Sequence, residues 1–417
     1  MELTKVKLSD VARVEISGVD KKSKPGQKNV RLCNFVDVYH NWAITQDMRD
    51  SFMEATASDK EIEALSIKKG QVAFTKDSET RDDIGIPTYI ADDFDDVVLG
   101  YHNALITPDE RKLNGKYLNA FMHSSYIQKY FENNASGSGQ RYTLSNDTVN
   151  SIPVLLPSIK DQEKIGNLFS FIDRKITLNK KMNQKLEAMA KRLYDYWFVQ
   201  FDFPDKNGRP YKTSGGPMTY NPTLKREIPV GWEVSTLANF AEYVKTTTKF
   251  DNAFNYVSTD NMLAEKQGLS GEILKPASGN VLCYEKNDIL ISNIRPYFKK
   301  IWYADQSGTC STDVLCIRSL NSDNSYFVYK TLWQDDFFDY VMQGAKGSKM
   351  PRGDKTRIMN YPICIAKENF DELIKKFSAL TIPMQAIIQK NTKEISRLTK
   401  LRDKLLPLLM NGQVEVK

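Results

Sequence analysis

The feature that most constrains the fold of this chain is an internal repeat. The stretch NASGSGQRYTLSNDTVNSIPVLLP covers residues 134–157, and GAKGSKMPRGDKTRIMNYPICIA covers residues 344–366. When Ala135 is set on Ala345, Gly137 aligns with Gly347 and Ser138 aligns with Ser348. One skipped residue later, Pro153 aligns with Pro362, each after a polar run. A pattern repeated at this distance indicates a chain built from two related halves.

Each half passes through the same order of patterns. A short run rich in β-branched residues comes first, at 68–76 and at 285–293, and predicts a strand. An aromatic helical pattern follows, at 116–133 and at 325–342. The glycine–serine stretch, a strand that begins with proline and a long helical segment complete each half. We therefore predict two α/β heads, each followed by a long helix.

The first long helix is predicted from LPSIKDQEKIGNLFSFIDRKITLNKKMNQKLEAMAKRLYDYWF, residues 156–198. Ser158 is followed three residues later by Asp161, which is a capping-box pattern. Mainly apolar residues then recur every seven positions in two rows, over about five heptads. The rows are Ile165, Ile172, Asn179, Leu186 and Leu193, and, four residues behind them, Phe169, Ile176, Asn183, Ala190 and Trp197.

The second long helix is predicted from PMQAIIQKNTKEISRLTKLRDKLLPLLMNG, residues 383–412. Pro383 can occupy its first turn, where the missing N–H costs nothing, and four extra residues at 381–384 predict an interruption there. Its rows are Ile388, Ile395 and Leu409, and Asn391, Leu398 and Leu405. A seam of this length favours two helices that pair with each other, with the asparagines setting the register; two core helices in separate domains are the alternative.

Composition narrows the class of protein. The 417 residues carry a net charge of +6, which permits an anionic partner without requiring one. The five cysteines are scattered and form no CxxC pair, so we expect neither a disulfide framework nor a zinc site. No apolar signal core opens the chain and no run of eighteen apolar residues occurs, so we predict a cytoplasmic protein.

The remaining segments offer no catalytic constellation. His40, His102 and His123 stand far apart in the sequence, and a structural or contact role is expected for each. The segment between the halves, FDFPDKNGRPYKTSGGPMTYNPTLKREIPVGWEV at 201–234, is dense in glycine, proline and asparagine, so we predict a linker without elements of its own. The chain therefore reads as a binding protein.

The glycine–serine stretches are the candidate binding sites. Small residues let a backbone approach a ligand closely. Serine hydroxyls and lysine suit phosphate, whereas glutamine and arginine can read the edges of bases; a plain polar turn is the alternative for any single residue. The candidate DNA-contacting residues are Ser136, Ser138, Gln140, Arg141 and Tyr142 in the first half, and Lys346, Ser348, Lys349 and Arg352 in the second.

Together these patterns resemble the specificity subunits of type I restriction–modification systems. The resemblance covers essentially the whole chain and rests on the two half-repeats, the first long helix, the linker motifs FDFPDKNGRPYKTSGG and IPVGWEV, and the terminal LRDKLLPLLMNGQ. It implies that each head is a target-recognition domain for one half of a split sequence in double-stranded DNA, and that an antiparallel helix pair spaces the heads.

The resemblance also implies the partners and cofactors. Two modification subunits would dock on the helices and methylate adenine, and restriction subunits, when present, would translocate and cut DNA. S-adenosylmethionine, ATP and Mg are expected on those subunits, with no cofactor bound by this chain and no membrane partner. The absence of methyltransferase, ATPase and nuclease motifs agrees with that division of labour. A two-headed coiled-coil adaptor that binds protein is the alternative.

The predicted fold class is α+β, with two α/β target-recognition domains, two long helices packed as an antiparallel coiled coil, and a pseudo-two-fold repeat. The predicted boundaries are 1–157 for the first head, 158–200 for the central helix, 201–231 for the linker, 232–367 for the second head and 368–417 for the C-terminal helix. The residues predicted to pair the helices and bind subunits are Ile165, Ile172, Asn179, Leu186, Leu193, Trp197, Ile388, Asn391, Ile395, Leu398 and Leu405.

Overall fold

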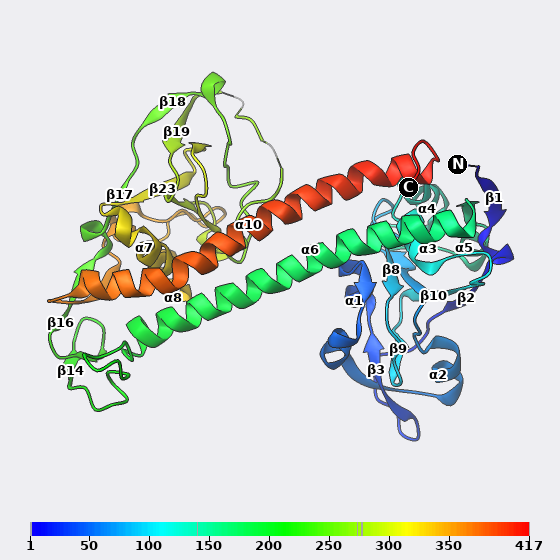
Figure 1. Ribbon diagram of the computed structural model, residues 1–417, viewed down its shortest axis with the longest axis horizontal. Coiled ribbons are helices and arrows are strands. Elements are labelled where there is room, and N and C mark those ends of the chain that lie inside the picture. The colour runs from blue at the N-terminus through cyan, green and yellow to red at the C-terminus, as the bar shows by residue number, and fades with distance from the viewer. Residues whose placement is uncertain (1, 140, 273, 277, 417) are drawn as a thin grey trace. The chain divides into compact units, whose positions relative to one another are not determined.

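The computed structural model describes residues 2–139, 141–272, 274–276 and 278–416 (Figure 1). Contacts divide the chain into two compact units, residues 1–179 with 394–417, and residues 180–393. The division crosses both long helices, because each head takes part of each helix into its own core. The predicted class, two mixed heads with long helices, is confirmed.

The first head is built around a five-stranded sheet with the order β2-β10-β6-β8-β4. Its strands are β2 (Ala12–Ile16), β10 (Asn103–Pro108), β6 (Val72–Thr75), β8 (Pro87–Ile90) and β4 (Ala43–Ile44). The pairs are antiparallel except β4 with β8. Every residue of β6 and β8 is buried, so this sheet forms the centre of the head.

A second layer extends the first head. It contains the three-stranded sheet β5-β3-β9 with two short helices. These elements are β3 (Lys28–Cys33), α1 (Phe35–His40), β5 (Met53–Ala57), α2 (Asp59–Leu65) and β9 (Val97–Leu99). Val30, Leu32, Ala55 and Val98 form a small apolar cluster of their own here, which makes the layer a packed structure rather than a surface loop.

The second head repeats the central sheet of the first. Its order is β17-β23-β20-β21, which corresponds strand for strand to β2-β10-β6-β8. The strands are β17 (Ala241–Tyr243), β23 (Val314–Ser319), β20 (Ile289–Ser292) and β21 (Ile301–Tyr303), with β18 (Thr247–Lys249), β19 (Asn280–Tyr284) and β22 (Gly308–Cys310) in a separate three-stranded sheet. The strands predicted at 68–76 and 285–293 are confirmed as β6 and β20.

Each head closes with an antiparallel strand pair. In the first head β1 (Thr4–Lys7) pairs with β13 (Pro153–Leu156), and in the second β16 (Trp232–Thr236) pairs with β24 (Pro362–Ala366). The prolines at 153 and 362 begin β13 and β24, a position at the strand edge that proline tolerates. The predicted repeat is thus a repeat of topology as well as of sequence.

The aromatic patterns do not form single helices. The first divides into α3 (Gly115–Met122) and α4 (Ser125–Asn134), and the second into α7 (Ser325–Leu332) and α8 (Asp335–Gln343). Ser124 and Gln334 break the helical path because each adopts an extended backbone, with ψ of 147° and 150°, and serves as the N-cap of the next helix. The bend buries rings from both halves of each pattern, such as Phe121 and Phe131.

Helix α6 runs from Ile159 to Tyr194 and ends in a π-helical turn, η3 (Asp195–Val199). The predicted N-terminal cap is present, since the Asp161 amide donates to Ser158 Oγ at 3.2 Å and that hydroxyl donates to the Asp161 carboxylate at 2.7 Å. The turn η3 carries Trp197 and Phe198 into the core of the second head. The helix is therefore anchored by the head that follows it in sequence as well as by the one before.

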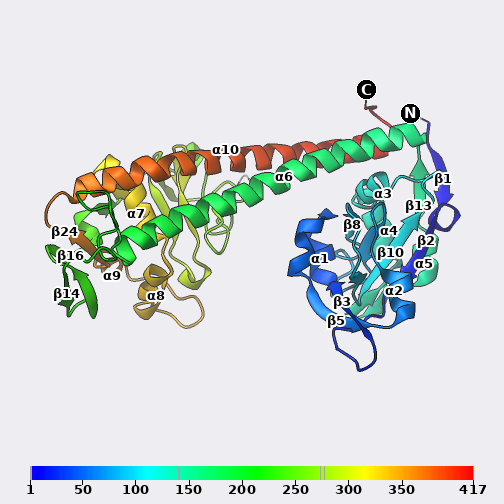
Figure 2. The ribbon, with the colours of Figure 1, turned by 60° about the horizontal axis from the view of Figure 1, so that its bottom comes forward.

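Helix α10 (Phe370–Met410) is one uninterrupted helix of 41 residues, and both views show it so (Figures 1 and 2). The predictions that Pro383 lies in the first turn and that residues 381–384 interrupt the helix are wrong. Proline inside a helix removes one hydrogen bond and costs about 3 kcal/mol. Buried side chains at 370, 374 and 377 hold the preceding turns in the second head's core and offset that cost.

Within each unit the two long helices pack against one another. In the first unit Ile172 and Ile176 of α6 form a cluster with Leu398 of α10. In the second unit the Asn391 amide donates to Asn183 Oδ1 at 2.9 Å. Residues later in the sequence of α6 contact residues earlier in the sequence of α10, so the two helices are antiparallel. The polar contact that fixes register here involves Asn183, which the sequence had placed in the other row from Asn179.

The segment between the heads is not a plain linker. It contains the antiparallel hairpin of β14 (Met218–Asn221) and β15 (Arg226–Pro229), so that part of the prediction is wrong. The Asn221 side chain accepts hydrogen bonds from the amides of Thr223 and Leu224 and shapes the hairpin turn. Phe201 and Ile228 are buried in the core of the second unit. The turn-forming residues mark the ends of short strands rather than an unstructured connection.

None of the helices in the described part of the chain is long and apolar enough to span a lipid bilayer.

Candidate nucleic-acid interface

The glycine–serine stretch of the first head lies in a small three-stranded sheet. Strands β11 (Ser136–Ser138), β12 (Arg141–Thr143) and β7 (Asp77–Ser78) pair in the order β11-β12-β7. Ser136 is opposite Thr143, and Thr143 is opposite Asp77. Because β7 follows directly on the central strand β6, this sheet is fixed to the core of the head.

The second head repeats this frame with single bridges in place of strands. Lys346 bridges Arg352, and Arg352 bridges Ile294, which follows β20 as Asp77 follows β6. The supporting backbone bonds also correspond: the Asn293 amide donates to the Asp313 carbonyl at 2.9 Å, as the Lys76 amide donates to that of His102 at 2.8 Å. Arg352 thus takes the place of Thr143, and Asp313 the place of His102.

In the first head a histidine holds the candidate arginine. Nη2 of Arg141 lies 3.2 Å from Nδ1 and 3.4 Å from Nε2 of His102. Nδ1 of His102 also lies 2.5 Å from Oδ2 of Asp77. The imidazole thus lies between the Asp77 carboxylate and the Arg141 guanidinium, which is within hydrogen-bond distance of both ring nitrogens. The guanidinium is therefore oriented by a chain of side chains before any ligand arrives.

Asp77 stays ionised beneath that chain. Burial raises the pKa of Asp77, but hydrogen bonds from Thr143 and His102, with the nearby Lys76 cation, together bring the pKa below its usual value. Lys76 Nζ also donates to Thr143 Oγ1 at 3.0 Å. A fixed negative charge under His102 supports the outward-facing positive charge of Arg141.

The other predicted residues of the first loop have distinct places. The Tyr142 ring is covered by the Arg81 guanidinium, 5.2 Å from its centroid. Ser136 Oγ donates to the Thr143 carbonyl at 3.3 Å, so this hydroxyl is engaged by backbone. Ser138 is described only as a strand residue of β11, and Gln140 lies outside the described residues.

Gly137 is required by the close approach of β11 and β12. Its φ is 131°, in a region that favours glycine, and a Cβ atom built there would lie 2.2 Å from the Arg141 carbonyl oxygen. The small residue thus allows β11 and β12 to close upon one another and brings Arg141 over His102.

In the second head carboxylates hold the cations. Arg352 Nη2 lies 3.1 Å from Asp313, and Lys346 Nζ lies 3.2 Å from Asp354. A hydrogen bond from the Arg357 amide and then the Lys346 contact lower the pKa of Asp354, which is also the N-cap of α9 (Lys355–Met359). Ser348 and Lys349 are exposed between the two bridged positions. Both loops therefore present cations, through different supports.

Comparison with known proteins shows what the chain is similar to. Residues 2–188 match the family described as the type I restriction modification DNA specificity domain. The type I restriction enzyme MjaIX specificity subunit of Methanocaldococcus jannaschii is 24% identical over 318 residues, covering 72% of this chain and 69% of that protein. The HindI specificity subunit of Haemophilus influenzae is 22% identical over 417 residues, covering 84% and 87%. The chain is therefore similar to type I restriction–modification specificity subunits, and its residues 2–188 match their DNA specificity domain.

A solved structure supports the fold described above. The type I restriction–modification S subunit from M. genitalium matches with a TM-score of 0.60 at 14% identity, over 98% of this chain and 96% of that one. At this identity the likeness concerns the fold alone. It shows that a fold of two mixed heads with long helices occurs in a solved structure.

Sequence reasoning missed several residues of the candidate interface. In the first head they are Lys76, Asp77, Arg81 and His102, and in the second Arg295, Tyr297, Phe298 and Asp313. The segments 76–86 and 293–300 that hold most of them follow equivalent strands, so the repeat could have pointed to them. The cation–aromatic alternation of IRPYFKK was a second signal. His102 and Asp313 carry no local signal, because only strand pairing brings them to the loops.

The predicted helix-seam residues are buried or half-buried throughout, from Ile165 on α6 to Leu405 on α10. Ile165 packs into the core of the first head, and Leu193 and Trp197 pack into that of the second. Ile172 and Leu398 meet between the helices. Asn179 is also buried, and its amide Nδ2 has no hydrogen-bond partner among the described residues. Their part in binding other subunits stays a prediction.

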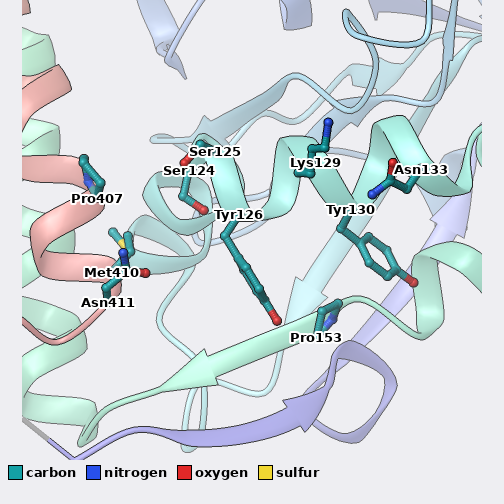
Figure 3. Close-up of a pocket in the computed structure, with 10 residues that line it drawn as sticks. All are labelled: Ser124, Ser125, Tyr126, Lys129, Tyr130, Asn133, Pro153, Pro407, Met410 and Asn411. Carbon is teal, nitrogen blue, oxygen red and sulfur yellow. The ribbon is translucent and has the colours of Figure 1, made fainter.

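A cavity of about 470 Å³ lies elsewhere in the first unit (Figure 3). It is lined by residues of α4, by Pro153 of β13 and by the end of α10, with Tyr126 and Met410 among them. The candidate contact residues of the β11-β12-β7 sheet are not part of this lining. In the described part of the chain no three His, Cys, Asp or Glu side chains gather as a metal site.

Proposed function

We propose that this chain reads a two-part sequence in double-stranded DNA, one half with each head, and directs partner subunits to it. The observation that carries the proposal is the shared frame of the heads: equivalent backbone pairings with different side chains upon them. Two related sites with unlike side chains are what a split, asymmetric target requires. The family of the chain supports the same role, which is recognition rather than catalysis.

Each head offers the chemistry of base reading and phosphate binding. Arg141 and Arg352 are oriented by neighbouring side chains, and an oriented guanidinium can bond the O6 and N7 atoms of guanine together. Lys346 and Lys349 are exposed cations suited to phosphate. The interface thus combines sequence reading with the electrostatic affinity that DNA-binding surfaces need.

The long helices offer a docking surface for two modification subunits, and for restriction subunits where the system has them. Helix α6 exposes Phe171, Leu178, Met182 and Met189, which lie outside its paired seam. Large apolar side chains exposed along a helix are typical of protein–protein interfaces. We infer that S-adenosylmethionine, ATP and Mg belong to those partners, which would perform adenine methylation, translocation and cleavage.

Methylome sequencing of cells that carry this chain with its modification subunit tests the proposal. We expect one split adenine-methylated motif. Exchange of residues 1–156 for the first head of another family member should change one half of that motif and leave the other half intact. Simultaneous change of both halves would show that the heads are not independent readers.

A binding measurement separates this function from a protein-binding adaptor. The chain, alone or with its modification subunits, should bind duplex DNA with an affinity that falls steeply as salt rises, because phosphate contacts release counterions. The purified chain with S-adenosylmethionine should transfer no methyl group to DNA. Salt-independent or undetectable DNA binding by the assembled complex would favour the adaptor.

A further inference from the structure

A short aromatic turn projects from the second head beside its candidate loop. The turn is η6 (Pro296–Phe298), and it connects β20 to β21. Tyr297 is 45% exposed and Phe298 is 37% exposed, and their ring centroids are 4.6 Å apart. Two adjacent, partly exposed rings at the tip of a turn leave apolar surface in water.

The turn is held in a strained conformation. Arg295 and Lys299 flank it with φ of 50° and 51°, a left-handed backbone that costs a non-glycine residue energy. The surroundings enforce it: the Arg295 amide donates to the Pro351 carbonyl at 2.8 Å, and the Phe298 carbonyl accepts from the Glu265 amide at 2.9 Å. Strain that is fixed from both sides is a feature of functional sites.

An ion cluster braces the far side of the turn. Lys266 and Lys299 both contact Asp335, at 2.8 and 2.7 Å. Hydrogen bonds from these two lysines lower the pKa of Asp335 to about 2, so the carboxylate remains charged. Lys300 Nζ donates to the Thr259 carbonyl at 2.7 Å. The rings are therefore carried on a rigid, cation-rich base.

The turn belongs to the same surface as the candidate loop. Ile294 bridges Arg352, and Arg295 bonds the backbone of Pro351 in that loop. Nε of Arg295 is buried and has no hydrogen-bond partner among the described residues, so the guanidinium is not fully satisfied by this chain. An anionic partner that approaches Arg352 would meet Arg295 and the two rings together.

We propose that Tyr297 and Phe298 form an aromatic wedge that packs against the bases of the DNA half-site read by the second head. The proposal rests on the function proposed above and adds to it one specific contact with DNA. Apolar wedges inserted at base steps and rings stacked on bases are established ways for proteins to hold nucleic acid. The flanking cations favour DNA over a protein partner, because they would neutralise the phosphates on either side of the step.

The first head has no such wedge. Its equivalent segment, residues 76–86, carries Asp77, Glu79, Asp82 and Asp83 and has no aromatic residue. The effect is therefore confined to one half of the target, and the first half-site serves as an internal reference within the same complex.

The test uses the specificity subunit assembled with its modification subunits and a duplex bearing the methylome-defined motif. 2-Aminopurine is placed at successive positions of each half-site, because its fluorescence reports unstacking. We expect a fluorescence change at one step of the second half-site on binding. Tyr297→Ala should abolish that change and weaken specific binding about tenfold, in keeping with the loss of one stacked ring. Tyr297→Phe should retain both.

Tyr220→Ala is the matched control, since Tyr220 is 64% exposed in the same unit, on β14. Equal melting temperatures will show that both alanine variants are folded. Wild-type affinity in Tyr297→Ala overturns the wedge, as does an equal loss on unrelated DNA or a loss of modification subunits in size-exclusion chromatography. A wild-type complex that binds the motif no better than unrelated DNA would instead defeat the proposed function itself.

Discussion

The two heads place an arginine on the same backbone frame and hold it by different means. In the first head Arg141 contacts His102, the residue just before β10. In the second head Arg352 forms an ion pair with Asp313, the residue just before β23. The supporting positions are equivalent, but one carries an imidazole backed by Asp77 and the other a carboxylate. The frame thus brings an arginine to this support from two different positions, because Arg352 takes the place of Thr143 and Arg141 lies two residues before Thr143.

The neighbouring turns differ more strongly. Residues 76–86 of the first head are acidic and contribute β7 to the small sheet, whereas residues 293–300 of the second are basic and aromatic and contribute one bridge. Both connect equivalent strands of the central sheet. Variation is therefore greatest where the backbone leaves the sheet, because substitutions there disturb no core packing.

The largest expected difference between the units appears on acidification. His123 stacks on Trp42 at 4.0 Å, and burial together with Arg402 lowers its pKa to about 3. Because the folded pKa lies below the ordinary value, the neutral form stabilises the first unit above pH 6.5, and that stability is lost as the pH falls toward 3. We expect a loss of about 3 kcal/mol in the first unit by pH 4.

Urea unfolding at pH 7 and pH 4, followed by pulsed hydrogen exchange in each unit, measures this loss. His123→Phe keeps a stacked ring and should remove most of the pH dependence, whereas His40→Phe should leave it unchanged. Equal pH dependence in wild type and His123→Phe would contradict the assignment.

Glycine substitutions should affect the two loops unequally. Gly137→Ala places a Cβ atom 2.2 Å from a backbone oxygen, whereas in Gly347→Ala the nearest atom is 3.2 Å away. Both glycines have positive φ, so we expect roughly 1 kcal/mol of strain at Gly347 and about 2–3 kcal/mol at Gly137. Methylome sequencing should show a relaxed first half-site for Gly137→Ala and a milder change of the second for Gly347→Ala. The reverse order would mean that the frames are not equivalent.

Arginine substitutions should separate the half-sites. Arg141→Ala should weaken or relax the first half-site by about 1–3 kcal/mol, and Arg352→Ala should do the same to the second. Binding of duplexes mutated in one half-site at a time measures both effects. A uniform loss on all sequences with a smaller salt slope would identify a phosphate contact, and no change would return that loop to a structural turn.

The smallest expected effect concerns the brace under the aromatic turn. The pKa of Asp335 is depressed, so its ionised carboxylate stabilises the folded protein at pH values above the ordinary pKa of an aspartate. This stabilisation is lost as the pH falls toward 2. Because the carboxylate is half exposed, the contribution should stay below about 1 kcal/mol. Thermal unfolding between pH 2 and pH 5 should show a flatter pH dependence in Asp335→Asn. If Asp335→Asn shows the same pH dependence of thermal unfolding as the wild type, Asp335 does not brace the turn.

Local patterns in the sequence determined the elements that depend on local physics. The cap at Ser158, the heptad rows of α6 and the strands at β6 and β20 each follow from side chains close together in the chain. The repeat also indicated two related heads. Three predictions failed: a helix that begins at Pro383, an aromatic helix that continues through Ser124, and a linker without strands at 218–229. At these places packing into a head outweighed the local signal.

Only the tertiary structure decided how the candidate interface is built. Arg141 meets His102, and Arg352 meets Asp313, through strand pairings between residues far apart in sequence. Neither His102 nor Asp313 belongs to a recognisable sequence motif, because a histidine or aspartate just before a strand does not by itself indicate a role. The sequence by itself determined that each head offers cations on a small-residue loop; the sheet determined which side chains orient them, because backbone hydrogen bonds between distant strands set those neighbours.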